Sequence, residues 1–185
     1  MQPEPEQMLD SAVSALSSDG DWRAVLDALP APIYTTDHEG AVTYWNAACV
    51  EFAGREPRLE RDRWCVMWQL YTMIGEPLKH EDCPMAQAIK QQTPIRDTIA
   101  IAERPDGTRL AFRPYPTPLF DDDGALTGAV NLLIDVTEEQ SEALHEQADR
   151  CRRLADALYS RESSDVLEGM VTRFEQAARK LRRKA

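Results

Sequence analysis

The segment "RLAFRPYPTPLF", residues 109–120, decides what kind of sheet this chain can build. It has the composition of a β-strand, yet every second position in its second half is proline: Pro114, Pro116 and Pro118. Because the backbone N–H groups of a strand point alternately to its two edges, all three missing N–H groups fall on one edge. That edge cannot carry a regular ladder beyond about Arg113, whereas the opposite edge can. We therefore expect the preceding strand to pair only with the beginning of this one.

Turn chemistry around this segment predicts four further strands. The stretch "RDTIAIAE" (96–103) leads into it through the turn "RPDG", and "ALTGAVNLLIDV" (125–136) follows the turn "DDDG". Nearer the N-terminus, "PIYTTDHEGAVTYWN" (32–46) predicts a hairpin, because "DHEG" is a turn sequence in which Gly40 can adopt a positive φ. The chain therefore has the pattern of an antiparallel sheet.

Short helices are predicted between these strands. Asp21 is suited to cap a helix at its N-terminus, and "AACVEFAG" (47–54) forms a helix that ends at a glycine. An amphipathic patch at residues 9–16 indicates one more helix, and for residues 55–83 we expect short helical pieces. The apolar face of the helix that Asp21 begins carries Trp22, Val25, Leu26 and Leu29.

The pattern and the charge both change near residue 137. Thr137 and Gln140 fit a capping box, and two apolar stripes separated by "SRESSD" predict an antiparallel helical hairpin. Residues 141–185 carry 10 basic and 8 acidic side chains, whereas the rest of the chain carries 11 and 24. We divide the chain into an N-terminal segment (1–21), a domain (22–137) and a helical hairpin (138–185).

Composition and motifs exclude several classes of protein. The chain of 185 residues is 43% hydrophobic and 29% charged, which is typical of globular proteins. A net charge of −11 argues against nucleic acid as the main partner. With no long apolar run and an acidic start, we expect a cytoplasmic protein that does not enter a membrane. No phosphate-binding glycine loop, GxSxG or HExxH motif is present, so we expect no enzymatic activity.

The stretch "HEDCPMAQAI" (80–89) places a histidine and a cysteine at the start of a helix. Proline disfavours the α conformation in the residue before it, so Cys83 should be the N-cap and Pro84 the first helical residue. A thiol at a helix N-terminus can have a lowered pKa, but the acidic neighbours Glu81 and Asp82 oppose that shift.

Four interpretations of Cys83 remain open, and we favour an inert N-cap residue tucked under the helix. The second is a redox-active thiol paired with Cys65. The third is a metal site formed by Cys65, His80 and Cys83, although zinc sites usually have four ligands in paired spacings. The fourth is haem bound through His80 or through the Cys-Pro pair.

Aromatic and thioether side chains gather in the middle of the chain. Such side chains suit the lining of a pocket for a small apolar ligand, but ordinary core filling explains them more simply. The residues concerned are Trp45, Trp64, Met67, Trp68, Tyr71 and Met85.

The order of these elements, together with particular motifs, resembles a PAS domain over residues 22–140. "LPAPIYTTDHEGAVTYWNAA" is similar to the opening of PAS sensors, and "GAVNLLIDVTEEQ" is similar to their closing strand and D-[IV]-T-E exit motif. The middle of the chain resembles a subtype found in bacterial two-component sensor proteins. The resemblance implies an α+β fold, in which short helices cup a five-stranded antiparallel sheet flanked by an N-terminal helix and the C-terminal hairpin.

The resemblance also bears on cofactors. Flavin photosensors of this family carry a reactive cysteine in an Asn-Cys-Arg motif, which this chain lacks, so flavin is not expected. Haem-binding members usually hold iron through a histidine on the helix before the third strand. Here that helix reads "PMAQAIKQQ", and His80 lies just before it. No cofactor is therefore firmly implied, although haem stays open.

The function expected from these observations is that of a non-catalytic sensory module. It would act as a homodimer and through a signalling partner such as a sensor kinase, and it could bind a small ligand. The dimer would use residues 1–30 and the exit helix, where Leu144, Cys151 and Leu158 recur at every seventh position. A weaker alternative is an orphan phosphotransfer site at His145, although a solvated helix face explains that residue without chemistry.

Overall fold

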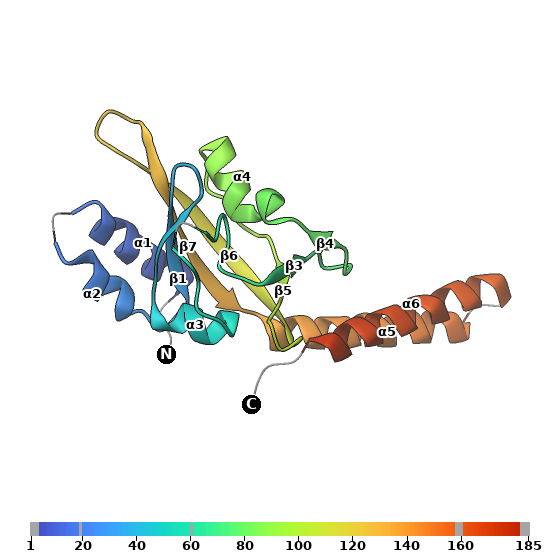
Figure 1. The fold of residues 1–185 in the computed structure, drawn as a ribbon. Coiled ribbons are helices and arrows are strands. Elements are labelled where there is room, and N and C mark those ends of the chain that lie inside the picture. The colour runs from blue at the N-terminus through green and yellow to red at the C-terminus, as the bar shows by residue number, and fades with distance from the viewer. Residues whose placement is uncertain (1–3, 19, 60, 158–160, 182–185) are drawn as a thin grey trace.

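The computed structural model describes residues 4–18, 20–59, 61–157 and 161–181. The strands are β1 (Ile33–Asp37), β2 (Val42–Trp45), β3 (Gln69–Tyr71), β4 (Pro77–Leu78), β5 (Ala100–Glu103), β6 (Arg109–Phe120) and β7 (Leu126–Asp135). The helices are α1 (Pro5–Leu16), α2 (Trp22–Asp27), α3 (Ala47–Ala53), α4 (Pro84–Gln91), α5 (Thr137–Ala157) and α6 (Arg161–Lys180), and η1 (His80–Asp82) is a single 3-10 turn. The strands form one antiparallel sheet in the order β2-β1-β7-β6-β5-β3-β4 (Figure 1).

The proline-rich strand β6 pairs as its sequence predicts. Its unbroken edge pairs with β7 from Phe112 to Phe120, whereas β5 pairs with β6 only between Arg109 and Phe112. Beyond that point the carbonyl of Pro116 accepts hydrogen bonds from Ile95 N (3.3 Å) and from the Arg96 side chain (3.0 Å). The expected strand 96–103 therefore begins only at Ala100, because the proline edge offers its earlier residues no N–H donors.

Alternation along the strands separates two apolar layers. On one face, the cup face, Tyr34, Phe112 and Leu133 belong to the same buried cluster as residues of α3 and α4. On the outer face, Ile33 and Leu132 pack with residues of α1 and α2. Figure 1 shows α1 and α2 beside β1 and β7, with α4 over the other side of the sheet. The predicted α+β class, with an antiparallel sheet and helices at both ends of the chain, is confirmed.

Local signals explain where the short helices begin and end. Asp21 accepts a hydrogen bond from Ala24 N at 3.3 Å and caps α2, as expected. Asn46 caps α3 by accepting one from Cys49 N at 3.1 Å, and Gly54 ends that helix with a φ of 66°. Val25 departs from expectation, because its side chain is 40% exposed rather than inward.

Residues 55–83 differ most from the prediction. Instead of helical pieces alone, they contain the short hairpin β3–β4, which extends the sheet beyond β5 and brings the strand count to seven rather than five. The backbone groups on the far edge of β5 require hydrogen-bond partners, and β3 supplies them through the pairing of Leu70 with Ala102. The expected helical structure is found between residues 77 and 83 as the 3-10 turn η1 alone.

The C-terminal hairpin is antiparallel, as predicted, and extends away from the sheet (Figure 1). Arg152 of α5 pairs with Glu175 of α6 at 2.5 Å, and nearer the tip Ser164 lies against Ala155. At its base, Leu144 and Leu181 pack into a small cluster on the outer face of the sheet.

The proposed dimer seam on α5 is largely used inside the chain. Cys151 is buried, with 6% of its surface exposed, and Leu144 packs against the sheet. Leu158 lies outside the described residues. In the same way, Met8 and Leu9 of α1 are buried against the outer face of the sheet. The heptad spacing predicted the buried stripe correctly, but tertiary folding has covered that stripe with α6 and the sheet.

Candidate functional site

The cysteines of the middle segment lie in the core beneath α4. Cys83 is the N-cap of α4 with Pro84 as its first residue, as predicted, but its thiol makes no capping hydrogen bond. The thiol lies 3.8 Å from the Trp64 carbonyl oxygen, to which Tyr34 Oη also donates at 2.9 Å. Burial raises the pKa of Cys65 to about 12 and that of Cys83 to about 11. Both groups are therefore neutral thiols near pH 7, which favours the inert interpretation.

The metal site considered for Cys65, His80 and Cys83 does not form. Among the described residues, no three histidine, cysteine or carboxylate side chains gather closely enough to hold a metal ion. The reason is the proline, which fixes Cys83 as an N-cap with its thiol turned into the core, while His80 lies on η1. The spacing H-x-x-C therefore brings the two residues near each other in sequence without directing them to one point.

The residues present do not fit a haem group either. Helix α4 carries no histidine to ligate iron. The cup face, where a planar group would lie, is occupied by Met67, Met85 and Phe112, which are exposed by 2% or less and belong to one packed cluster. His80 keeps a buried Nε2 atom without a hydrogen-bond partner in the described chain, but it lies on η1, before α4 begins.

The six aromatic and thioether residues proposed as a pocket lining do not line one common apolar pocket. Met67 and Met85 fill the core, and Trp45 packs against it. Tyr71 belongs instead to the cluster on the outer face, where Arg109 stacks on its ring at 3.8 Å.

Three of the six meet at a surface cavity, which we call the rim pocket. Its volume is about 490 Å³. It is lined by Arg55, Arg61, Asp62, Arg63, Trp64, Cys65, Met67, Trp68, Lys79, His80 and Glu81. Trp68 is 51% exposed, which is unusual for so large an aromatic side chain. Three of the predicted lining residues and two of the predicted ligand residues, Cys65 and His80, thus come together here, with a different chemistry from the apolar pocket expected.

A tight backbone arrangement holds Trp64 in the wall of the rim pocket. Trp64 has a φ of 67°, and its N–H donates to the Gly40 carbonyl at 2.7 Å. A Cβ atom on Gly40 would lie 2.2 Å from the indole ring, so only glycine fits at this turn. The "DHEG" turn therefore serves two purposes: it closes the first hairpin and leaves room for the tryptophan.

The sequence reasoning missed the cations of the rim pocket. Arg55, Arg61 and Arg63 lie in one stretch of nine residues, although the domain around them is strongly acidic. This local cluster of cations is the signal that the sequence contains. Arg55 pairs with Asp62 at 2.6 Å and donates to the Val66 carbonyl at 3.1 Å, fixing the loop around the pocket. The sequence predicts only short helical pieces for these residues, and it does not show that their side chains converge on one pocket.

A second site is the junction where β7 passes into α5. Thr137 does not form the predicted capping box. Its hydroxyl accepts from Ala111 N at 3.1 Å and donates to Ala111 O at 3.3 Å, while Asp135 accepts from Thr137 N at 2.9 Å. Since Val136 N also donates to Ala111 O, the exit segment continues the ladder of β6 before the helix begins. The start of α5 is therefore tied to the centre of the sheet.

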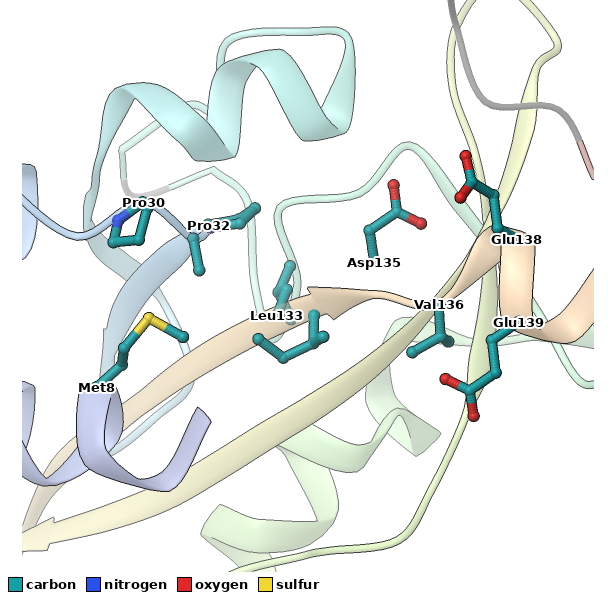
Figure 2. Close-up of a pocket in the computed structure, with 10 residues that line it drawn as sticks. Met8, Pro30, Pro32, Leu133, Asp135, Val136, Glu138 and Glu139 are labelled. Atoms are coloured by element: carbon teal, nitrogen blue, oxygen red, sulfur yellow. The ribbon is translucent and has the colours of Figure 1, made fainter. Parts of the chain in front are cut away.

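A surface pocket of about 490 Å³ opens beside this junction. Figure 2 shows Met8, Pro30, Pro32 and Leu133 on its apolar side and three carboxylates near the beginning of α5. The carboxylates belong to Asp135, Glu138 and Glu139. Glu139 also pairs with Arg113 at 3.2 Å, which adds a second link between α5 and β6.

Comparison with known proteins identifies the family. A family profile described as the PAS fold matches residues 26–141, more than half of the chain. The chain therefore belongs to the PAS family, whose members are typically sensory and signalling domains. A search of curated proteins finds no match. No helix in the described ranges is long and apolar enough to cross a membrane.

Solved structures resemble this chain at low sequence identity. The LOV protein from Rhodobacter sphaeroides is 10% identical, with a TM-score of 0.48 over 97% of this chain and 99% of that one. The LOV domain of a blue-light activated histidine kinase from Erythrobacter litoralis is 18% identical, with a TM-score of 0.44 over 58% and 96% of the two chains. A PAS domain from Colwellia psychrerythraea is 16% identical, with a TM-score of 0.44 over 63% and 94%.

Proposed function

We propose that the protein is a non-catalytic PAS signalling module, which senses a small ligand and passes the signal through its helical hairpin. It acts as a homodimer and contacts a signalling protein such as a sensor kinase. The observation that carries this proposal is the pair of hydrogen bonds between Thr137 and Ala111, because it couples the first turn of α5 to the sheet. A shift of β6 or β7 would thereby be transmitted to the hairpin.

The hairpin itself supports the dimer. Its exposed apolar side chains are Leu154 (50%), Val166 (62%) and Met170 (39%). Val166 and Met170 lie four residues apart and therefore form a row on one face of α6, and Leu154 adds an exposed apolar side chain on α5. Two hairpins that join through such a row would form a four-helix bundle, in which these side chains leave water. A second copy of the chain is the simplest occupant, since it presents the same row.

Light scattering tests the dimer. We expect the unaltered chain to show twice the monomer mass, and a Leu154→Glu/Met170→Glu variant to show the monomer mass, because two charges would be buried in the bundle. Leu59→Glu is the matched control. Leu59 is 55% exposed on the PAS body, the part of the chain that precedes the hairpin, so this variant should leave the dimer intact.

Two outcomes would contradict the proposal. A monomeric unaltered chain at tens of micromolar would exclude a stable homodimer. A double variant that keeps the dimer mass would exclude the hairpin face, and Val25→Glu would then test the surface of residues 1–30, where Val25 is 40% exposed. Circular dichroism checks that each variant retains its helices.

The alternative sensor chemistries receive less support. The neutral, buried thiols of Cys65 and Cys83 disfavour a redox sensor, and His145 is an exposed residue of α5 whose Nδ1 lies 2.7 Å from the Ser141 carbonyl in its own helix. We therefore do not extend the proposal to redox or phosphotransfer chemistry.

A further inference from the structure

The rim pocket has an unusual charge for this protein. Four cationic side chains and two carboxylates line it, although the chain as a whole carries a net charge of −11. Arg55 and Asp62 neutralise each other in a partly buried pair, with 16% and 17% of their side chains exposed. The remaining cations are Arg61, Arg63 and Lys79, opposed in the lining by Glu81 alone. An excess of positive charge therefore faces the cavity.

Two of these cations form exposed ion pairs. Lys79 lies 3.4 Å from Glu81, and both side chains are more than half exposed. Arg63 lies 3.7 Å from the Glu39 carboxylate in a similarly exposed pair, and it also donates to the Glu39 carbonyl at 2.5 Å. Exposed pairs of this kind contribute little, so a bound anion can compete for the same cations. Arg61 has no side-chain partner among the residues that the structure describes.

The apolar part of the rim pocket is flat and aromatic. Trp68 is half exposed beside Trp64, and Met67 closes the floor from the core. Arg63 and Lys90 lie 5.8 Å from the centre of the Trp64 ring, so cations already surround this ring. A ligand with a planar apolar group would cover the exposed face of Trp68, while its charged group meets the arginines.

His80 adds a hydrogen-bonding group to the lining of the rim pocket. Its Nε2 atom is buried and has no partner within the described chain. Burial lowers the pKa of His80, so the ring is neutral near pH 7 and can donate from one nitrogen and accept at the other. A polar group left without a partner is commonly satisfied by water or a ligand.

We propose that the rim pocket binds a small anion, a carboxylate or phosphate joined to a planar apolar group. Its volume of about 490 Å³ lies within the range of small-molecule sites. The proposal rests on the ligand-sensing part of the proposed function and gives the ligand its chemical class. Binding is measured on the PAS body, whereas the hairpin is tested by mass, so either can fail without the other.

The four tryptophans provide a local test. In a ¹H–¹⁵N spectrum of the full chain, titration with benzoate or phenyl phosphate should move the indole signals of Trp64 and Trp68 in a saturable way. The signals of Trp22 and Trp45, which lie outside the rim pocket, should stay in place. Single Trp→Phe variants assign the four signals, and benzamide and benzylamine serve as the neutral and cationic probes of the same shape.

An Arg61→Gln/Arg63→Gln variant tests whether binding requires these charges. It should weaken binding of the anions by about tenfold or more, because the charge-assisted hydrogen bonds between the arginines and the anion are lost. Arg150→Gln/Arg153→Gln removes the same charge from the exposed surface of α5 and should leave binding unchanged. If phenyl phosphate binds and benzoate does not, the site is specific for phosphate.

Three results would overturn the proposal. Equal shifts with benzamide would show that charge plays no part. Shifts of all four indole signals, or no saturable shift up to tens of millimolar, would show that the pocket is not a binding site. Unchanged anion binding in the Arg61→Gln/Arg63→Gln variant would assign the anions to another surface, and an acidic protein partner would become the better explanation of the cations.

Discussion

The PAS body and the hairpin use their apolar residues in different ways. Helix α4 has eight residues and buries four of them, whereas α6 has twenty and buries only Ala178. The body closes its core within one chain, because α3 and α4 cover one face of the sheet and α1 and α2 cover the other. The hairpin has a single partner helix and leaves apolar side chains in water. The body therefore gains more free energy from the burial of its apolar side chains than the hairpin does.

The largest expected effect comes from the core of the body. Leu133 is fully buried in the cluster of the cup face, so Leu133→Ala should lower the free energy of unfolding by about 2–5 kcal/mol. Leu167 of α6 is half-buried, and Leu167→Ala should cost about 1 kcal/mol or less. Urea unfolding followed by fluorescence measures both. Equal costs would show that the hairpin is as well packed as the body.

An intermediate effect is expected at the junction that joins the two regions. Thr137→Val keeps the shape of the side chain but leaves Ala111 N without its acceptor, which should cost about 1–3 kcal/mol. Thr172→Val is the matched control, because its exposed hydroxyl donates only within α6 to Glu168 O. Amide exchange in the first turn of α5 should also become faster. A neutral Thr137→Val would mean that the sheet does not hold the exit helix.

The smallest effect concerns His80 and appears as a pH dependence. Burial lowers the pKa of His80 below 6.5 in the folded chain, with Arg55 acting in the same direction, whereas the Met67 backbone and the charge of Asp62 oppose the shift. The unfolded chain thus binds the proton more tightly, and the stabilisation present above about pH 6.5 is lost as the pH falls. The urea midpoint should decrease between roughly pH 7.5 and pH 5.5, and less so in His80→Asn. The exposed His38→Asn should behave like the unaltered chain, and an identical decrease in His80→Asn would contradict this account.

The sequence predicted the fold well where one local rule decides the structure. The alternating prolines of β6 set which edge pairs, Pro84 placed Cys83 at the start of α4, and the hairpin followed from its stripes. Predictions failed where distant partners compete. Residues 69–71 became a strand because β5 lacked a partner at its far edge, and the hydroxyl of Thr137 bonded to β6 instead of capping α5.

The candidate site shows the same division. The sequence by itself determined that tryptophans, methionines and a histidine lie in the middle segment, and that an acidic body adjoins a slightly basic hairpin. Only the tertiary structure decided that Met85 fills the core while Trp68 stays half exposed beside Arg61 and Arg63. The physical reason is that strand alternation and helix periodicity specify a side chain's face within its own element. Which faces meet depends on backbone groups and surfaces far apart in the chain.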